Sequence, residues 1–391
     1  MSFFTTYSKK LEKLIAAVIF LLTFVVYFLT MAPTVSFWDT GEFIATSHIL
    51  GVPHPPGSPL FLLVGKFFSL IPLSDDIAFR VNIFSPIISA LTISLLFLIC
   101  NQFIDRLDNN NENRFFKMWS SLTASLTFAF THSHWFNAVE TEVYAFSGFM
   151  TALVIYLIML WSKKINNSNH IIYLMMISYV IGLATGLHLL NLLTIPFIGL
   201  IIYHTIGKLS ARNLFFALAL SIIIFFGIQS FIIQGLPQIT LSIGLVGLIC
   251  LVLTLLIITG YSIKKNQALS SIFLSSVLLI IIGYSTYFAI FIRSGQDPNI
   301  DENNPETIAE AISYLNRDQY GQMTILPRKF DNLPSKISIV GSPNNNRKFS
   351  FEQEIDYMLY DIPSQANFLW NYQIKKMYIR YFLWQFAGKG K

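Results

Sequence analysis

Long apolar runs alternate along this chain with short polar stretches that carry most of its charges. Runs long enough to cross a bilayer core of about 30 Å as helices lie at residues 14–31, 82–104, 143–161, 170–188, 189–206, 213–233, 238–262 and 268–292. A shorter run at 118–131 is needed to keep consecutive loops on opposite sides. The runs are rich in Leu, Ile and Phe and lack a two-residue alternation, which favours helices over a β-barrel. The pattern predicts an all-α integral membrane protein with about nine transmembrane helices.

Basic residues give these predicted helices an orientation. If the runs alternate in direction, twelve basic residues share one side: Lys9, Lys10, Lys13, Arg106, Arg114, Lys117, Lys163, Lys164, Lys208, Arg212, Lys264 and Lys265. The opposite loops before Arg293 hold only Lys66 and Arg80. Because loops rich in Lys and Arg stay in the cytoplasm, we expect the N-terminus inside and the other set of loops outside.

The first outer loop is too structured to be a plain connector. It reads FWDTGEFIATSHILGVPHPPGSPLF over residues 37–61, and its pattern predicts short helices at 40–50 and 58–70. The stretch between them holds Pro53, Pro55 and Pro56, with Pro59 just beyond, and proline fixes φ and removes a donor. We expect two juxtamembrane helices joined by a stiff corner.

The composition changes after Arg293. The stretch DPNIDENNPETIAEAISYLNRDQYG is rich in acids and asparagine, with a predicted helix at 305–316. Residues 365–386 are aromatic and amphipathic and contain basic residues, which is more typical of an interfacial or packed helix than of another span. We therefore predict a membrane domain at 1–292 and an outer, soluble or interfacial segment at 293–391.

Carboxylates are absent from Val143 to Gln296 and gather instead in the outer loops. Asp39 and Glu42 follow the first apolar run. Asp-x-x-Glu is a helix-capping pattern, yet a carboxylate held at the membrane interface, where partial desolvation raises its pKa, also suits a general base. Both interpretations remain open on the sequence.

A second polar cluster lies in THSHWFNAVETEVYAF, residues 131–146. An extended backbone would put each of its pairs on one side: His132 with His134, and Glu140 with Glu142, followed by Tyr144. Such groups could hold a divalent metal, position a phosphate or line a polar pocket, but their spacing matches no established ligand set. Whether a metal binds is therefore left open.

A phosphate in an outer site needs a cation, and few are available there. Arg80 offers the planar fork that suits a phosphate, although it could equally anchor its helix by snorkelling. His54 also falls in the first predicted outer loop, and His188 lies at the outer turn between the runs at 170–188 and 189–206. The sequence contains no phosphate-binding Gly-rich loop, nucleophile elbow or Cys-His zinc spacing, and its basic residues form no patch for nucleic acid.

Two classes of function fit these features. A transporter or lipid flippase usually relies on charged groups within the membrane, and the predicted spans contain no carboxylate. An enzyme acting at the outer surface on a lipid-linked substrate needs apolar helices, outer acids and a cation, and the sequence has all three.

Three separated motifs add a family resemblance. SFWDTGEFIATSHILGVPHPPGSPLF, HSHWFNAVETEVYAFSGF and DENNPETIAEAISYLNRDQYG together resemble the bacterial membrane-protein family related to an animal transmembrane protein O-mannosyltransferase, within the GT-C glycosyltransferase superfamily. The resemblance implies a GT-C-like helix bundle, a polyprenyl-phosphate mannose donor and Ser or Thr hydroxyls of an exported protein as acceptor. It also implies a bacterial cytoplasmic membrane, with the active site on its outer face.

The resemblance assigns roles to the candidate residues. Asp39 would be the catalytic base of an inverting displacement, with Glu42 as its neighbour or substitute. The acceptor side or a divalent metal would use Glu140, Glu142 and Tyr144, and the donor phosphate would use His54, Arg80, His132, His134 and His188. No cofactor is required with certainty, and an enzyme that glycosylates a lipid or cell-envelope glycan stays an alternative. Family members are generally longer, so we expect this chain to be a fragment or one half of a split protein.

Overall fold

The computed structural model describes residues 9–107, 114–207, 210–321 and 362–387. It divides the chain into two compact units, Met1–Gln319 and Tyr320–Lys391. The described elements are helices, and the single β-bridge among them joins Val52 to Asp301. The second unit contains α16 (Ile362–Asn367), the π-helical η6 (Phe368–Ile379) and α17 (Arg380–Ala387). The helix predicted at 365–386 is therefore confirmed.

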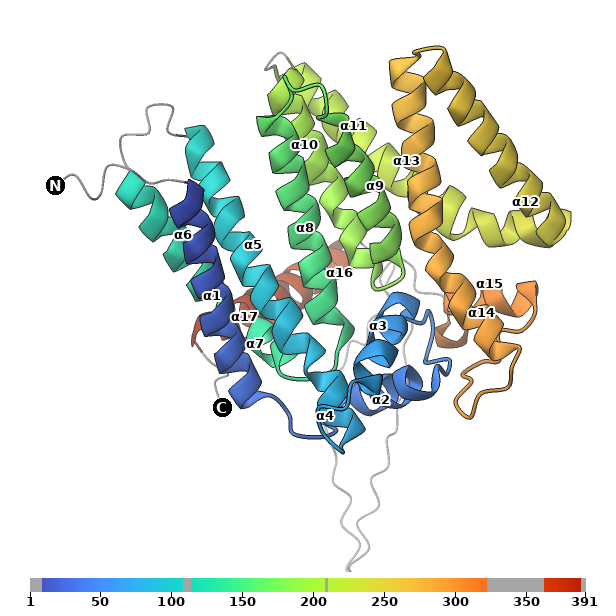
Figure 1. Cartoon of the computed structure of the whole chain (residues 1–391), viewed down its shortest axis with the longest axis horizontal. Coiled ribbons are helices and arrows are strands. Elements are labelled where there is room, and N and C mark those ends of the chain that lie inside the picture. Colours follow the sequence, from blue (N-terminus) through green and yellow to red (C-terminus); the bar gives the residue numbers. More distant parts are fainter. Residues whose placement is uncertain (1–8, 108–113, 208–209, 322–361, 388–391) are drawn as a thin grey trace, which may run out of the picture. The chain divides into compact units, whose positions relative to one another are not determined.

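Long helices lying side by side form most of the first unit (Figure 1). They are α1 (Lys9–Thr30), α5 (Phe84–Leu107), α6 (Arg114–Ala129), α8 (Val143–Lys163), α9 (Ile171–Thr185), α10 (Thr194–Ile206), α11 (Ala211–Gly227), α12 (Gly235–Lys264) and α13 (Ala268–Tyr284). Short elements connect them: α2 (Thr40–Ile49), α3 (Pro59–Leu70), α4 (Ile77–Asn82), α7 (His132–Ala138), η2 (Leu189–Leu193), η3 (Ile228–Ile233), η4 (Ser285–Tyr287), α14 (Phe288–Ser294), α15 (Ile308–Asn316) and η5 (Asp318–Tyr320). The two helices predicted in the first outer loop are α2 and α3.

Six stretches among the described residues are long and apolar enough to cross a membrane. They are Lys10–Thr30, Ile77–Arg106, Val143–Lys163, Leu189–Ile206, Ala211–Lys264 and Ala268–Ser294. The runs predicted at 213–233 and 238–262 both lie inside Ala211–Lys264. The runs predicted at 118–131 and 170–188 correspond to α6 and α9, which have only 16 and 15 residues. The chain is thus an all-α membrane protein in its described part, and nine crossings stay a prediction.

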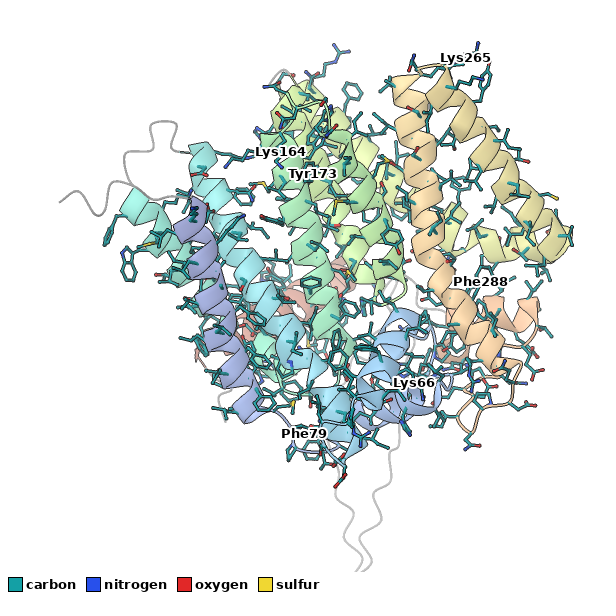
Figure 2. The ribbon with its side chains drawn as sticks, viewed as in Figure 1. Lys66, Phe79, Lys164, Tyr173, Lys265 and Phe288 are labelled. Carbon is teal, nitrogen blue, oxygen red and sulfur yellow. The ribbon has the colours of Figure 1, made fainter. Side chains whose placement is uncertain are left out.

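Basic side chains mark one end of the helix bundle. Lys164 and Lys265 lie at that end, whereas Lys66 lies at the opposite one (Figure 2). The end that carries Lys66 also carries α2, α3, α4 and α14 (Figure 1). The loops that the sequence assigns to the outer side therefore meet at one end of the first unit, which we call the loop end.

A row of contacting aromatic rings packs the loop-end helices α2 and α3 against the helix bundle. Phe43 of α2 contacts Phe61 of α3, which contacts Phe84 of α5, and Phe84 contacts Phe146 of α8. The ring centroids are 5.4, 6.1 and 5.0 Å apart in that order. All four residues are buried, and such ring pairs add stabilisation beyond the burial of their area. This contact fixes α2 against the helices that enter the membrane.

A buried amide joins two further loop-end segments. Asn82 donates to the carbonyl oxygens of Ala32 and Thr34, each at 2.9 Å, and accepts a hydrogen bond of 2.5 Å from Thr141. Asn82 is fully buried, so each of these bonds satisfies a group that has no access to water. The chain after α1 and the chain before α8 are therefore held together, which brings both acidic motifs to one place.

Residues 293–319, here called the bracing segment, pack on the proline-rich corner. Arg293 donates to the carbonyl oxygen of Leu50 at 2.7 Å, and Val52 forms the bridge to Asp301. Tyr314 is buried and donates a 2.5 Å hydrogen bond to the carbonyl oxygen of Pro53. The compact unit consequently ends after Gln319, later than the domain boundary predicted at residue 292. The composition of the sequence predicted that the chain becomes more polar after Arg293, but it could not predict these contacts with the corner.

Gly57 shows how closely Tyr314 approaches the corner. Its φ is +72°, a conformation that favours glycine, and a Cβ there would lie 2.7 Å from the Tyr314 hydroxyl oxygen. The corner therefore has room for glycine alone at this position.

Tyr314→Phe is expected to lower the stability of the first unit. It removes the hydrogen bond to Pro53 and leaves that buried carbonyl oxygen without its donor, at a cost of about 1–3 kcal/mol. The thermal midpoint of the detergent-solubilised protein measures the change, with the exposed neighbour Ser313→Ala as control. Equal midpoints for the two variants would show that the bond does not brace the corner.

Candidate functional site

Asp39 is the first carboxylate of the candidate site along the chain. It precedes α2 as the N-cap residue, but its exposed side chain accepts no capping hydrogen bond. Trp38 before it has a φ of +61° and a side chain that is 83% exposed. The capping interpretation of Asp39 is therefore wrong, because its carboxylate accepts no hydrogen bond from the helix amides. The exposed carboxylate is open to a substrate.

The carboxylate of Glu42 is hydrogen-bonded to His54 in the proline-rich corner. One of its oxygens accepts a 2.5 Å hydrogen bond from the backbone N–H of His54, and the other lies 2.8 Å from Nδ1 of the same histidine. Burial raises the pKa of Glu42, but the hydrogen bonds and the charge of His54 outweigh it, so the pKa falls below its ordinary value. The bond to Glu42 raises the pKa of His54. The pair is thus an ion pair when His54 is protonated, and Glu42 is poorly placed to accept a substrate proton.

The second acidic motif supplies two buried carboxylates. Glu140 accepts a 2.8 Å hydrogen bond from Ser36, and Glu142 begins α8 as its N-cap residue, accepting from the backbone N–H of Val143 at 3.2 Å. Burial raises the pKa of Glu140. Burial, and then the negative charge of Asp39, raise the pKa of Glu142 to about 7. Glu142 is therefore about half protonated at pH 7, and Asp39 lies close enough to influence it.

Glu302 of the bracing segment joins the same group of acids. Its backbone N–H donates to the carbonyl oxygen of Val52 at 3.1 Å, and its side chain interacts with that of Glu42. Burial and the charge of Glu42 raise the pKa of Glu302. Five carboxylates, here called the acid cluster, thus share the loop end: Asp39, Glu42, Glu140, Glu142 and Glu302.

A cationic side chain borders the acid cluster. Tyr144 and His188 pack together with ring centroids 5.4 Å apart, and His188 accepts a 3.2 Å hydrogen bond from the backbone N–H of Leu190. The guanidinium of Arg317, just after α15, lies close enough to act electrostatically on both. Burial and then Arg317 lower the pKa of His188, which favours its neutral form. Arg317 therefore supplies the positive charge on this side of the site.

The sequence did not single out Glu302 or Arg317. Both lie in the motif DENNPETIAEAISYLNRDQYG, whose composition and family resemblance do not distinguish either residue from its neighbours. The sequence offered one signal for Arg317, namely a single positive charge within an otherwise acidic motif. Nothing local indicated that this stretch meets the corner more than 200 residues away, as the 2.5 Å bond from Tyr314 to Pro53 requires.

Three predicted donor-binding residues lie outside this arrangement. Arg80 donates to the backbone carbonyl oxygens of Ser74 and Ser69, which favours the anchoring interpretation left open by the sequence. His132 is exposed, whereas His134 packs against the rings of Tyr27 and Phe128. The two histidines would share one side only of an extended backbone, whereas both belong to helix α7, where positions two apart point to different sides. Burial lowers the pKa of His134 to about 4, which keeps it neutral.

A metal ion would need several His, Cys, Asp or Glu side chains close together. Within residues 9–107, 114–207, 210–321 and 362–387, no three His, Cys, Asp or Glu side chains come together in an arrangement that could hold an ion. A metal role for Glu140, Glu142 and Tyr144 stays a prediction.

Glu142 is expected to make stability depend on pH near neutrality. Its pKa is about 7 in the folded protein against an ordinary 4.5, so the folded state binds more protons than the unfolded state between these values. Its stabilising contribution is therefore complete at acidic pH and is lost as the pH rises towards 7. Thermal midpoints between about pH 5 and about pH 8 should fall more steeply for the wild type than for Glu142→Gln. Asp75→Asn, at an exposed position, should follow the wild type, and parallel curves for all three proteins would contradict the assignment.

Comparison with known proteins covers most of the first motif and the whole of the second, whereas the motif DENNPETIAEAISYLNRDQYG lies outside the family match. Residues 39–211 match the model of the protein O-mannosyl-transferase TMEM260 N-terminal domain. The chain is 29% identical over 187 residues to protein O-mannosyl-transferase tmem260 of Dictyostelium discoideum, covering 44% of this chain and 21% of that protein. It is 30% identical over 130 residues to protein O-mannosyl-transferase TMEM260 of Mus musculus, covering 33% and 17%.

These matches are partial on both sides. They span about a fifth of the length of the curated relatives, and no solved structure matches the chain. The matched residues include Asp39, Glu42, His54, Glu142 and His188 but not the bracing segment. Over this N-terminal region the chain is related to the transmembrane protein O-mannosyl-transferases.

Proposed function

We propose that this chain is a membrane glycosyltransferase that transfers mannose from a polyprenyl-phosphate donor to Ser or Thr hydroxyls of an exported protein. The names of its relatives support the sugar and the protein acceptor. The apolar helices support a lipid-linked donor, because such a donor reaches the enzyme within the bilayer. The basic residues at the end opposite Lys66 support a loop end outside the membrane, on the outer face of a bacterial cytoplasmic membrane.

The difference between Asp39 and Glu42 carries the proposal. Both belong to one motif, yet the carboxylate of Glu42 is held by two hydrogen bonds from His54. The carboxylate of Asp39 is exposed and accepts no hydrogen bond from the helix amides. The charge of Asp39 nevertheless acts on Glu142, His54 and Glu302. A general base must be open to the substrate, and the exposed Asp39 meets that condition beside the buried groups on which its charge acts.

The reaction would proceed by a single inverting displacement. Asp39 removes the proton of the acceptor hydroxyl as its oxygen forms a bond to the anomeric carbon. The bond from that carbon to the phosphate oxygen breaks, and its electron pair stays on the polyprenyl phosphate. The transition state has oxocarbenium character, as in other glycosyl transfers. Protonated Glu142 would donate a hydrogen bond to the sugar and would add no negative charge beside the phosphate.

The leaving phosphate needs a positive charge, and Arg317 is the residue we assign to it. Arg317 lies beside Tyr144 and His188, at the edge of the acid cluster. Its guanidinium can pair with two phosphate oxygens at once, and neutral His188 could donate a further hydrogen bond. This assignment replaces the one predicted for Arg80, which donates to the backbone carbonyl oxygens of Ser74 and Ser69 and so anchors its helix.

Asp39→Asn is expected to reduce sugar transfer by about 10²- to 10⁴-fold, because asparagine cannot take a proton. Purified protein, labelled polyprenyl-phosphate mannose and a Ser/Thr-rich acceptor provide the assay. Asp75→Asn, in the same outer loop, serves as the matched control, and thermal midpoints show that both variants are folded. Full activity of a folded Asp39→Asn protein would exclude Asp39 as the base. Transfer to a lipid or glycan acceptor alone would instead favour an envelope glycosyltransferase, and the absence of any transfer by the wild type would favour a flippase.

Arg317→Gln is expected to reduce turnover by about 10²-fold, because the developing phosphate charge loses its partner. Arg317→Lys should retain part of the activity, since a single point charge replaces the planar fork. Arg80→Gln should lower the thermal midpoint with little effect on turnover of the folded protein. If Arg80→Gln loses turnover and Arg317→Gln does not, the phosphate contact belongs to Arg80.

A further inference from the structure

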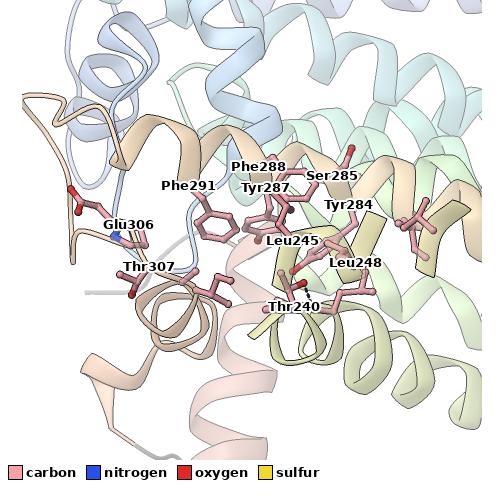
Figure 3. Close-up of a pocket in the computed structure, with 17 residues that line it drawn as sticks. Thr240, Leu245, Leu248, Tyr284, Ser285, Tyr287, Phe288, Phe291, Glu306 and Thr307 are labelled. Carbon is pink, nitrogen blue, oxygen red and sulfur yellow. Dashed lines mark hydrogen bonds between the residues drawn. The ribbon is translucent and has the colours of Figure 1, made fainter. Parts of the chain in front are cut away.

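An apolar cavity of about 260 Å³ lies between α12, α13, α14 and α15. Leu245 and Leu248 of α12 face Tyr284 of α13 and Phe288 and Phe291 of α14 across it (Figure 3). Its lining includes no Lys, Arg or His side chain, and the acidic group there is Glu306 before α15. A cavity of this composition suits a hydrocarbon chain and offers nothing to a phosphate.

A break in α12 creates the cavity. Gly244 has φ +72° and ψ 172°, so the helix changes direction there. Leu236 and Thr240 before the break and Leu245 and Leu248 after it all line the cavity. A Cβ at Gly244 would meet no atom within 4 Å, so glycine is needed for its backbone conformation rather than for space.

Helix α15 connects this cavity to the candidate site. Ile308 and Ala311, in its first turns, line the cavity, and Arg317 follows its last residue. At a rise of 1.5 Å per residue, Ala311 and Arg317 lie about 9 Å apart along the helix direction. Tyr287, which also lines the cavity, lies near Tyr314, the residue that holds the proline-rich corner. A molecule with an apolar chain and a charged head could therefore occupy the cavity and the edge of the acid cluster together.

We propose that the cavity receives the isoprenoid chain of the polyprenyl-phosphate donor, with the phosphate directed towards Arg317. The inference rests on the proposed function and adds the place where the lipid chain binds. One compartment admits one chain, which matches a polyprenyl phosphate and not a phospholipid with two acyl chains. The cation at the far end of α15 matches a phosphate head. The occupant thus has a single branched chain and an anionic end.

Binding of a radiolabelled polyprenyl phosphate without sugar tests the inference independently of catalysis. The protein is placed in nanodiscs of phosphatidylcholine, and Leu248→Trp is used to fill the cavity from α12. Excluding part of the chain should weaken binding about tenfold. Ile249→Trp, at an exposed position that does not line the cavity, is the matched control and should bind as the wild type does. If Leu248→Trp does not fold, Val252→Trp fills the same cavity.

The outcomes separate this inference from the proposed function. Equal binding by the cavity-filling variant and Ile249→Trp would overturn the inference, and so would displacement of the probe by an equal amount of phosphatidylglycerol. Sugar transfer that is unaffected by Leu248→Trp would overturn the inference while leaving the proposed function in place. Cavity-dependent binding by a wild type that transfers no sugar would support the lipid site and contradict the glycosyltransferase.

Discussion

The contact between His54 and Glu42 is the interaction on which the candidate site depends. It uses both oxygens of the carboxylate, at 2.5 and 2.8 Å, and joins the proline-rich corner to α2. A carboxylate bound in this way keeps its charge and its position, so it holds α2 in place and leaves Asp39 at the open end of the helix. In the proposed mechanism the two acids of this motif therefore have different roles: Glu42 anchors the corner and Asp39 acts as the base.

The bracing segment completes this arrangement from far along the sequence. It holds the corner through Arg293, Asp301 and Tyr314, and it adds Glu302 and Arg317 to the site. The family match ends at residue 211, before all of these residues. The matched region therefore contains the proposed base and the buried acids Glu140 and Glu142, while the cation we assign to the phosphate comes from outside it. A chain cut before residue 293 would keep the recognisable motifs and lose both the brace and that charge.

Apolar runs predicted the helices well, because the length and composition of a run depend on the bilayer and hardly on tertiary contacts. The proline spacing likewise predicted α2, α3 and the corner. Roles that depend on side-chain direction were harder to predict. Asp39 fits a capping pattern but does not cap, and His132 and His134 would share a side only if the backbone were extended, whereas the chain there is helical. Counting charges per loop put Arg80 on the correct end of the bundle but could not show that backbone carbonyl groups occupy it.

Charge balance explains why so many acids can share one small region. Asp39 and Glu42 are the carboxylates that must be ionised for the proposed reaction, and protonated His54 offsets Glu42 through their contact. Buried Glu142 is about half protonated at pH 7, since ionising it beside Asp39 would bring two like charges together in a poorly solvated place. An arriving polyprenyl phosphate adds negative charge, which Arg317 is positioned to offset. The pH dependence of Glu142 and the phosphate contact of Arg317 are thus two consequences of one constraint, namely that the site can hold only as much negative charge as its cations neutralise.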